Sequence, residues 1–145
     1  MTTACIFCQI IAGQSPAHKV YEDAHVLVFM DAFPVTDGHT LVVTKEHAAT
    51  LFDASPEALQ VVMAAARRVA HGIRQVMQPA GLMVFQLNGE AAGQTVFHYH
   101  MHLLPRAEGE PLALHGRVPG DPDRLRTQAE RFAAALPPPA GEPTR

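Results

Sequence analysis

Short runs of hydrophobic residues, separated by polar or glycine-containing breaks, follow one another along most of this chain. Residues 18–23 and 25–31 are β-favouring runs divided by an acidic break, which predicts a hairpin. The breaks 33–39 and 88–94 carry Asp-Gly or other glycines and predict loops. We therefore expect β-strands over residues 18–23, 25–31, 40–45, 82–87 and 96–105.

One long segment shows helical spacing instead. The Ser-Pro-Glu sequence at 55–57 supplies a capping hydroxyl, a proline in the first turn and an acid near the positive end of the helix dipole. Apolar residues then recur at three- and four-residue spacing to about Gln78, and Pro79 and Gly81 stop the helix. Residues 121–136 predict a shorter second helix, capped by its first aspartate. Strands on both sides of one long helix predict an α+β fold with a mostly antiparallel sheet.

Length and composition fit one globular domain. The chain has 145 residues, of which 48% are hydrophobic and 17% charged, and we expect a single domain over 1–136. Residues 137–145 have the proline-rich composition of a disordered tail. A formal charge of −3 gives no reason to expect nucleic acid as a partner. No segment reads as a signal peptide or a membrane span, so we expect a cytoplasmic protein with no membrane partner.

Three histidines alternate along the predicted strand 96–105, at His98, His100 and His102. Strand geometry places them on one face, with His98 and His102 roughly 13 Å apart. A zinc–nitrogen bond is only about 2.0–2.1 Å long, so the three rings cannot share one metal on a straight strand. At least one of them must therefore have a different role.

The loop that precedes these histidines has features of a phosphate site. Its glycines let backbone N–H groups approach a ligand closely, and Gln94 and Thr95 add neutral donors. An imidazole beside a bound phosphate can attack phosphorus and form a covalent intermediate. The N-terminal Cys5-x-x-Cys8 is half of a tetrahedral metal site, with a redox pair or a disulfide as alternatives.

The sequence GQTVFHYHMHLLPR resembles the signature of the histidine triad (HIT) family of nucleotide hydrolases and transferases. The blocks VYEDAHVLVFMD, GHTLVVTKEH and NGEAAGQ are similar to the family's other blocks, in their order. CIFCQIIAG is similar to the N-terminus of the bacterial zinc-binding, Hint-like branch. The resemblance covers roughly residues 4–106. It implies the HIT-like fold, with five strands in the sheet, and a homodimer.

The resemblance also implies a division of labour among the histidines. His100 would attack the α-phosphorus of a purine nucleoside phosphoramidate or dinucleoside polyphosphate, and water would release a nucleoside monophosphate from the nucleotidyl-histidine. His102 would orient the phosphate or leaving group, and His39 would support the same centre. Structural zinc would be held by Cys5, Cys8, His47 and His98.

Further positions correspond to the family's nucleotide site. Asp31 would accept hydrogen bonds from the ribose, and Val20 and Phe29 would line the purine pocket. Phosphate oxygens would be held by Gly93, Gln94 and Thr95, with Asn88 beside them.

One residue departs from the family's pattern. Leu87 stands where relatives usually place an amide or another polar residue facing the nucleotide, and a leucine cannot donate a hydrogen bond. This departure keeps open a second hypothesis, a nucleotide-binding regulatory module with negligible turnover. A third is a metallohydrolase with His98 and His100 as catalytic zinc ligands, which would leave Cys5 and Cys8 without a role.

Overall fold

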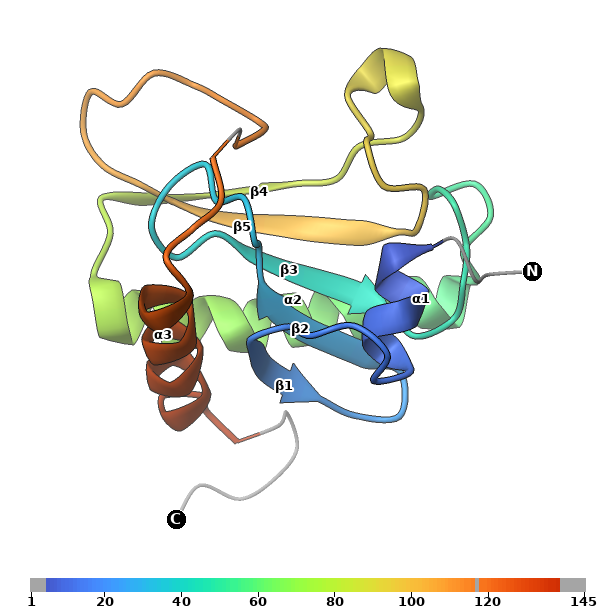
Figure 1. Ribbon diagram of the computed structural model, residues 1–145, viewed down its shortest axis with the longest axis horizontal. Coiled ribbons are helices and arrows are strands. Elements are labelled where there is room, and N and C mark those ends of the chain that lie inside the picture. Colours follow the sequence, from blue (N-terminus) through green and yellow to red (C-terminus); the bar gives the residue numbers. More distant parts are fainter. Residues whose placement is uncertain (1–4, 117, 139–145) are drawn as a thin grey trace.

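The computed structural model describes residues 5–116 and 118–138 of the chain. Three α-helices, one short 3-10 helix and five strands follow one another in this part (Figure 1). Their order is α1 (Ile6–Ile11), β1 (Lys19–Glu22), β2 (Val26–Met30), β3 (Thr40–Thr44), α2 (Pro56–Met77), β4 (Gly81–Phe85), η1 (Glu90–Ala92), β5 (His100–Arg106) and α3 (Pro122–Ala134).

The five strands form one sheet in the order β1-β2-β3-β5-β4, and every neighbouring pair is antiparallel. The predicted α+β class, the antiparallel five-stranded sheet, the long central helix and the shorter C-terminal helix are therefore confirmed. β5 lies between β3 and β4, so both of its edges are paired, and its side chains from His100 to Pro105 are buried.

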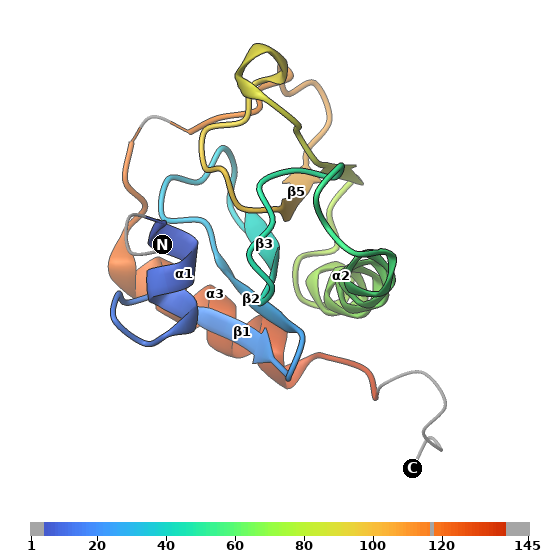
Figure 2. The same cartoon turned by 90° about the vertical axis from the view of Figure 1, so that its right-hand side faces the viewer.

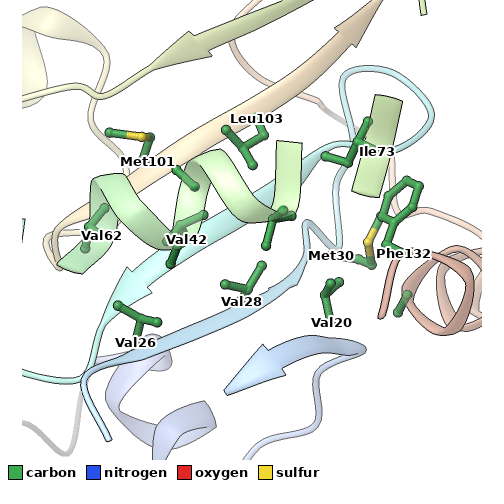
Figure 3. Close-up of a cluster of buried hydrophobic side chains, with 14 of the residues drawn as sticks. Val20, Val26, Val28, Met30, Val42, Val62, Ile73, Met101, Leu103 and Phe132 are labelled. Atoms are coloured by element: carbon green, nitrogen blue, oxygen red, sulfur yellow. The ribbon is translucent and has the colours of Figure 1, made fainter. Parts of the chain in front are cut away.

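The two faces of the sheet are covered differently. α2 lies across one face, and α1 lies on the opposite side of β2 and β3 (Figure 2). Side chains of the α2 face form the main core, together with α3 (Figure 3). A smaller apolar cluster on the α1 face contains Phe7, Ile10, Leu27, Phe29, Leu41 and Val43. His100 and His102 alternate along β5 with Met101 and Leu103 of the main core, so both histidines belong to the α1 face.

The helix-start signals operate as predicted. The hydroxyl of Ser55 accepts a hydrogen bond from the backbone N–H of Ala58 at 3.2 Å, and the Asp121 carboxylate accepts one from Arg124 N–H at 3.1 Å. α2 ends at Gln78, which adopts the left-handed conformation with φ 47°. The apolar stripe of α2 faces the core except at Met63, which is 56% exposed.

Two parts of the backbone differ from the sequence-based prediction. Residues 6–11 form a helix that the prediction lacks. The predicted strand 96–105 begins only at His100, because the residues before it bond outside the strand ladder: Tyr99 N–H donates to Ala48 C=O at 2.7 Å. His98 therefore lies in a bend rather than on β5, and the 13 Å strand spacing does not apply to it.

The C-terminal end of the described chain stays in contact with the domain. Leu136 packs against the main core, and Arg68 Nε donates to Pro137 C=O at 2.6 Å. Residues 139–145, most of the predicted disordered tail, lie outside the described residues. Within residues 5–116 and 118–138, no helix combines the length and the apolar character needed to cross a membrane.

Candidate functional site

A cavity of about 580 Å³ opens on the α1 face of the sheet, beside the histidines of β5. Antiparallel pairing puts His102 opposite Leu41 of β3 and Phe85 of β4, and His100 opposite Val43. Side chains from several separate segments meet here, among them Phe29, Asp31, Thr95, His100, His102 and His115. The cavity therefore combines an apolar wall with a few polar groups, which is typical of small-molecule sites.

His100 is held by a backbone carbonyl. Its Nδ1 lies 2.6 Å from the carbonyl oxygen of His98. A carbonyl can only accept, so Nδ1 carries the proton and Nε2 keeps its lone pair. His100 lines the cavity and is 7% exposed, so this unprotonated nitrogen is available to a ligand there. An oriented imidazole with a free Nε2 is a competent nucleophile.

His39 and His102 form a hydrogen-bonded pair with a defined proton order. Val35 N–H donates to His39 Nδ1 at 3.1 Å, so His39 carries its proton on Nε2. That nitrogen lies 2.9 Å from His102 Nδ1, which consequently accepts and leaves the His102 proton on Nε2. His102 thus offers an N–H donor while its neighbour His100 offers a lone pair, with 4.8 Å between the ring centroids.

Burial keeps these rings neutral. It lowers the pKa of His39 to about 4 and that of His102 to about 2, and nearby imidazoles add to both shifts. The pKa of His100 is also lowered by burial. Asp31 Oδ2 lies 3.3 Å from His39 Nε2, and burial raises the pKa of this carboxyl.

Aromatic rings fix the orientation of the two β5 histidines. Phe85 stacks on His102 with centroids 4.3 Å apart and an 8° angle between the planes. Phe7 of α1 meets His100 edge-on at 4.9 Å and His98 at 5.9 Å. Phe7 is buried, so α1 contributes a wall that separates the cavity from the cluster around His98.

Cys5, Cys8, His47 and His98 come together beside this wall. Their ligand atoms all lie within 4.8 Å of one another. Cys5 Sγ and Cys8 Sγ each lie 3.5 Å from His98 Nδ1, and Cys8 Sγ lies 3.2 Å from His47 Nδ1. The four residues assigned to zinc on resemblance are thus adjacent in space.

The hydrogen bonds of His98 suit a metal ligand. Its Nε2 lies 2.6 Å from the carbonyl oxygen of Thr44, so Nε2 carries the proton and the Nδ1 lone pair faces the two sulfurs. Two sulfurs and two imidazole nitrogens are the donor set that zinc selects in four-coordinate structural sites. These residues therefore fit a zinc ion.

The loop between β4 and β5 is braced by its own amides. Gln94 accepts from Gly89 N–H at 2.7 Å and donates to Ala49 C=O at 2.6 Å. Asn88 accepts from Leu51 N–H at 2.7 Å and is paired with Gln86. Both amides, expected at the phosphate, are occupied in holding this loop against residues 49–51.

Of the other two expected phosphate residues, Thr95 lines the cavity and Gly93 lies in the loop that precedes it. Gly93 has φ 97° and closes the 3-10 turn, a conformation that an L side chain rarely adopts.

The two residues expected at the purine are separated. Phe29 lines the cavity, whereas Val20 packs in the main core on the opposite face of the sheet. The register between β1 and β2 shifts between Lys19 and Tyr21, so Val20 is an extra residue that the regular alternation does not place. We therefore remove Val20 from the nucleotide site. Asp31 lies on the cavity, with Oδ1 accepting from Phe33 N–H at 2.8 Å.

Phe7 and His115 both line the cavity, and the sequence-based prediction assigns neither of them a role there. Phe7 follows Cys5 by two positions in a helix too short for periodicity to reveal. His115 comes from the long segment between β5 and α3, where no hydrophobic pattern indicates a position in space.

Comparisons with known proteins agree with this geometry. The profile of the HIT domain matches residues 12–109. Protein hit from Bacillus subtilis is 50% identical over 102 residues, which are 70% of each chain. A zinc-bound histidine triad family protein from Mycobacterium smegmatis superposes with a TM-score of 0.82 at 37% identity, covering 94% of this chain and 95% of that one. Adenylylsulfatase HINT3 from Arabidopsis thaliana is 35% identical over 74% of this chain and 55% of its own length.

Proposed function

The chain belongs to the HIT domain family, and from this premise we propose that it hydrolyses purine nucleoside phosphoramidates or dinucleoside polyphosphates. The product would be a nucleoside monophosphate, released from a nucleotidyl group carried by His100. One observation carries the proposal: His100 has its Nδ1 proton fixed on His98 C=O at 2.6 Å and its Nε2 free in the cavity. The adenylylsulfatase activity named for the Arabidopsis relative is a hydrolysis of the same general type.

The proposed reaction has two displacements at phosphorus. His100 Nε2 attacks the α-phosphorus, the bond to the leaving group breaks, and the leaving group takes its proton from water. Water then attacks the same phosphorus and gives a proton to the hydroxide left by the first step, the phosphorus–nitrogen bond breaks, and Nε2 recovers its electron pair. His102 Nε2–H donates to a phosphate oxygen, and His39 keeps that proton in place through the 2.9 Å bond to His102 Nδ1.

The remaining cavity residues would bind the nucleotide. Asp31 would accept from the ribose hydroxyls through Oδ2, since Oδ1 accepts from Phe33 N–H and the nearby His39 Nε2–H is directed at His102 Nδ1. Phe29 would contact the base, and Gly93 and Thr95 the phosphate. Gln94 and Asn88 would act through the loop that they brace.

We assign Cys5, Cys8, His47 and His98 to a structural zinc site. All four protein ligands together would fill a tetrahedral shell and leave no open position for a substrate. When bound, zinc would cross-link α1 to the loop after β3 and to the bend before β5. This assignment opposes the metallohydrolase hypothesis, because the free nitrogens of His98 and His100 belong to different sites. Replacing both cysteines by serine should abolish zinc content, measured by metal analysis of the purified protein.

A homodimer is the proposed assembly, on family resemblance. β4 forms an open edge of the sheet, and Val84 on it is 47% exposed. Open edges pair readily with other chains unless they are protected. Sedimentation analysis should give twice the chain mass, and a monomer at micromolar concentration would contradict the proposal.

The test of hydrolysis follows AMP release from an adenosine phosphoramidate by the wild type and by His100→Ala, with and without a chelator. We expect turnover by the wild type and none above background by the variant. Prompt loss of turnover on chelation, with the fold intact, would favour the metallohydrolase. Binding of AMP without any turnover would favour the regulatory module, which the apolar Leu87 keeps under consideration.

A further inference from the structure

His115 lies on the long segment between β5 and α3 and reaches the cavity from outside the sheet. None of the nucleotide-binding positions implied by family resemblance includes it. Its place next to the glycine loop makes it a candidate ligand for phosphate.

His115 and Leu87 lie against the same residue of that loop. A Cβ built on Gly93 would meet His115 Nε2 at 3.3 Å and Leu87 Cδ1 at 3.4 Å. By the family resemblance, Leu87 stands where a polar side chain would face the nucleotide, and a leucine cannot donate. An imidazole nitrogen is therefore present at the point of the loop where this chain lacks the usual polar group.

The backbone next to His115 is anchored. Gly116 packs so closely on the loop after β2 that an added Cβ would meet the Phe33 carbonyl oxygen at 2.1 Å. Gly120 N–H donates to Ala32 C=O at 2.8 Å. These two contacts hold the segment over the cavity beside Asp31, so His115 is placed by packing of its own backbone.

The imidazole of His115 is available to a ligand. Within residues 5–116 and 118–138, its side chain makes no hydrogen bond or ion pair. Its ring is nevertheless close enough to affect the site electrostatically, since it adds to the lowering of the pKa of His39, His100 and His102 by burial. It also opposes the rise that burial causes in the pKa of Asp31. An imidazole N–H of His115 can therefore interact with a negatively charged group that is bound between these residues.

We infer that His115 is a phosphate-binding, specificity-determining residue, which donates from its imidazole to a phosphate oxygen of the nucleotide and replaces the polar contact missing at Leu87. The inference rests on the proposed function and refines it. It assigns recognition of the phosphate partly to the C-terminal segment.

The test measures binding of AMP and of adenosine to the zinc-loaded protein by titration calorimetry. In His115→Ala, the Kd for AMP should rise about tenfold, the loss expected for one hydrogen bond to a charged group. The Kd for adenosine should not change, because adenosine has no phosphate. His115→Gln, which keeps an N–H donor, should recover part of the AMP affinity.

A second substitution tests the relation to Leu87. Leu87→Asn in the His115→Ala background should restore AMP affinity, since the asparagine would supply a donor close to the same point of Gly93. His25→Ala is the matched control, because His25 is exposed on the turn between β1 and β2, and it should bind AMP as the wild type does.

The outcomes separate the two proposals. Unchanged AMP affinity in His115→Ala, or an equal loss for AMP and adenosine, would overturn the role of His115 and leave the proposed function standing. Failure of the wild type to bind AMP would overturn the proposed function and this inference with it.

Discussion

His98 and His100 are two residues apart, and the backbone gives them opposite chemistry. His98 donates from Nε2–H to the Thr44 carbonyl, so its Nδ1 faces two sulfurs. His100 donates from Nδ1–H to the His98 carbonyl, which leaves the Nε2 lone pair free in a ring that lines the cavity. Both bonds are 2.6 Å long. The role of a histidine therefore depends on which of its two nitrogens a neighbouring carbonyl occupies, as much as on the presence of the ring.

Substitutions of His100 and of His98 should have the largest effects, and each should impair a different site. His100→Gln should lower the hydrolysis rate by roughly four orders of magnitude or more, because it removes the nucleophile. Its zinc content should remain that of the wild type. His98→Gln should instead lose zinc. AMP release and metal analysis on the same preparations check both statements. Loss of zinc from His100→Gln would show that the two sites are not separate.

The next effect concerns the wall between the sites. Phe7 is 6% exposed and contacts both His98 and His100 edge-on. Phe7→Ala should lower the free energy of unfolding by about 3–5 kcal/mol, the usual cost of truncating a buried phenylalanine. It should also weaken both zinc and AMP binding, unlike the two histidine variants.

Phe52→Ala is the control for Phe7→Ala, because Phe52 is 88% exposed. Urea denaturation should show little change for this variant. If Phe7→Ala weakened the binding of only zinc or only AMP, Phe7 would not be a wall shared by the two sites.

The smallest effect that we expect is a dependence of the free energy of unfolding on pH, which comes from the hydrogen-bonded His39–His102 pair. The folded pKa of His39 is about 4, against an ordinary 6.5. Below pH 6.5 the unfolded chain binds a proton that the folded chain does not, so stability falls as pH falls. The slope attributable to His39 is about 1.4 kcal/mol per pH unit between 6.5 and about 4, and it is absent above 6.5.

His39→Gln should remove this part of the slope, because the amide accepts from Val35 N–H and donates without titrating. Urea denaturation of the zinc-loaded proteins across this pH range makes the comparison. Since both proteins keep all four zinc ligands, the contribution of the metal site cancels. Parallel profiles for wild type and variant would show that His39 is not held neutral.

Much of the fold could be predicted from the sequence because its signals are local. The cap at Ser55, the apolar stripe of α2 and the β-favouring runs each fix an element without reference to distant residues. α1 could not be predicted this way: its six residues are too few for a periodic signal, and its buried side chains, Phe7 and Ile10, pack against the sheet.

The candidate site was predictable only in part. The strand spacing used to separate the roles of the three histidines does not hold at His98, which precedes β5, and resemblance supplied the residues now found in two clusters. The carbonyls of Thr44 and His98, which decide the free nitrogens, are main-chain atoms that no side-chain motif reveals. The register shift at Val20 and the close approach of Gly116 to Phe33, which places His115, likewise depend on tertiary packing.

Nuclear magnetic resonance can determine which ring nitrogen carries the proton in His98 and in His100, where the carbonyl contacts require opposite positions. Proton–nitrogen correlation spectra of the nitrogen-labelled, zinc-loaded protein at neutral pH distinguish the two ring nitrogens of each histidine. We predict a proton on Nε2 of His98, with Nδ1 bound to metal, and a proton on Nδ1 of His100, with Nε2 bare. A proton on Nε2 of His100, with Nδ1 bare, would contradict the account.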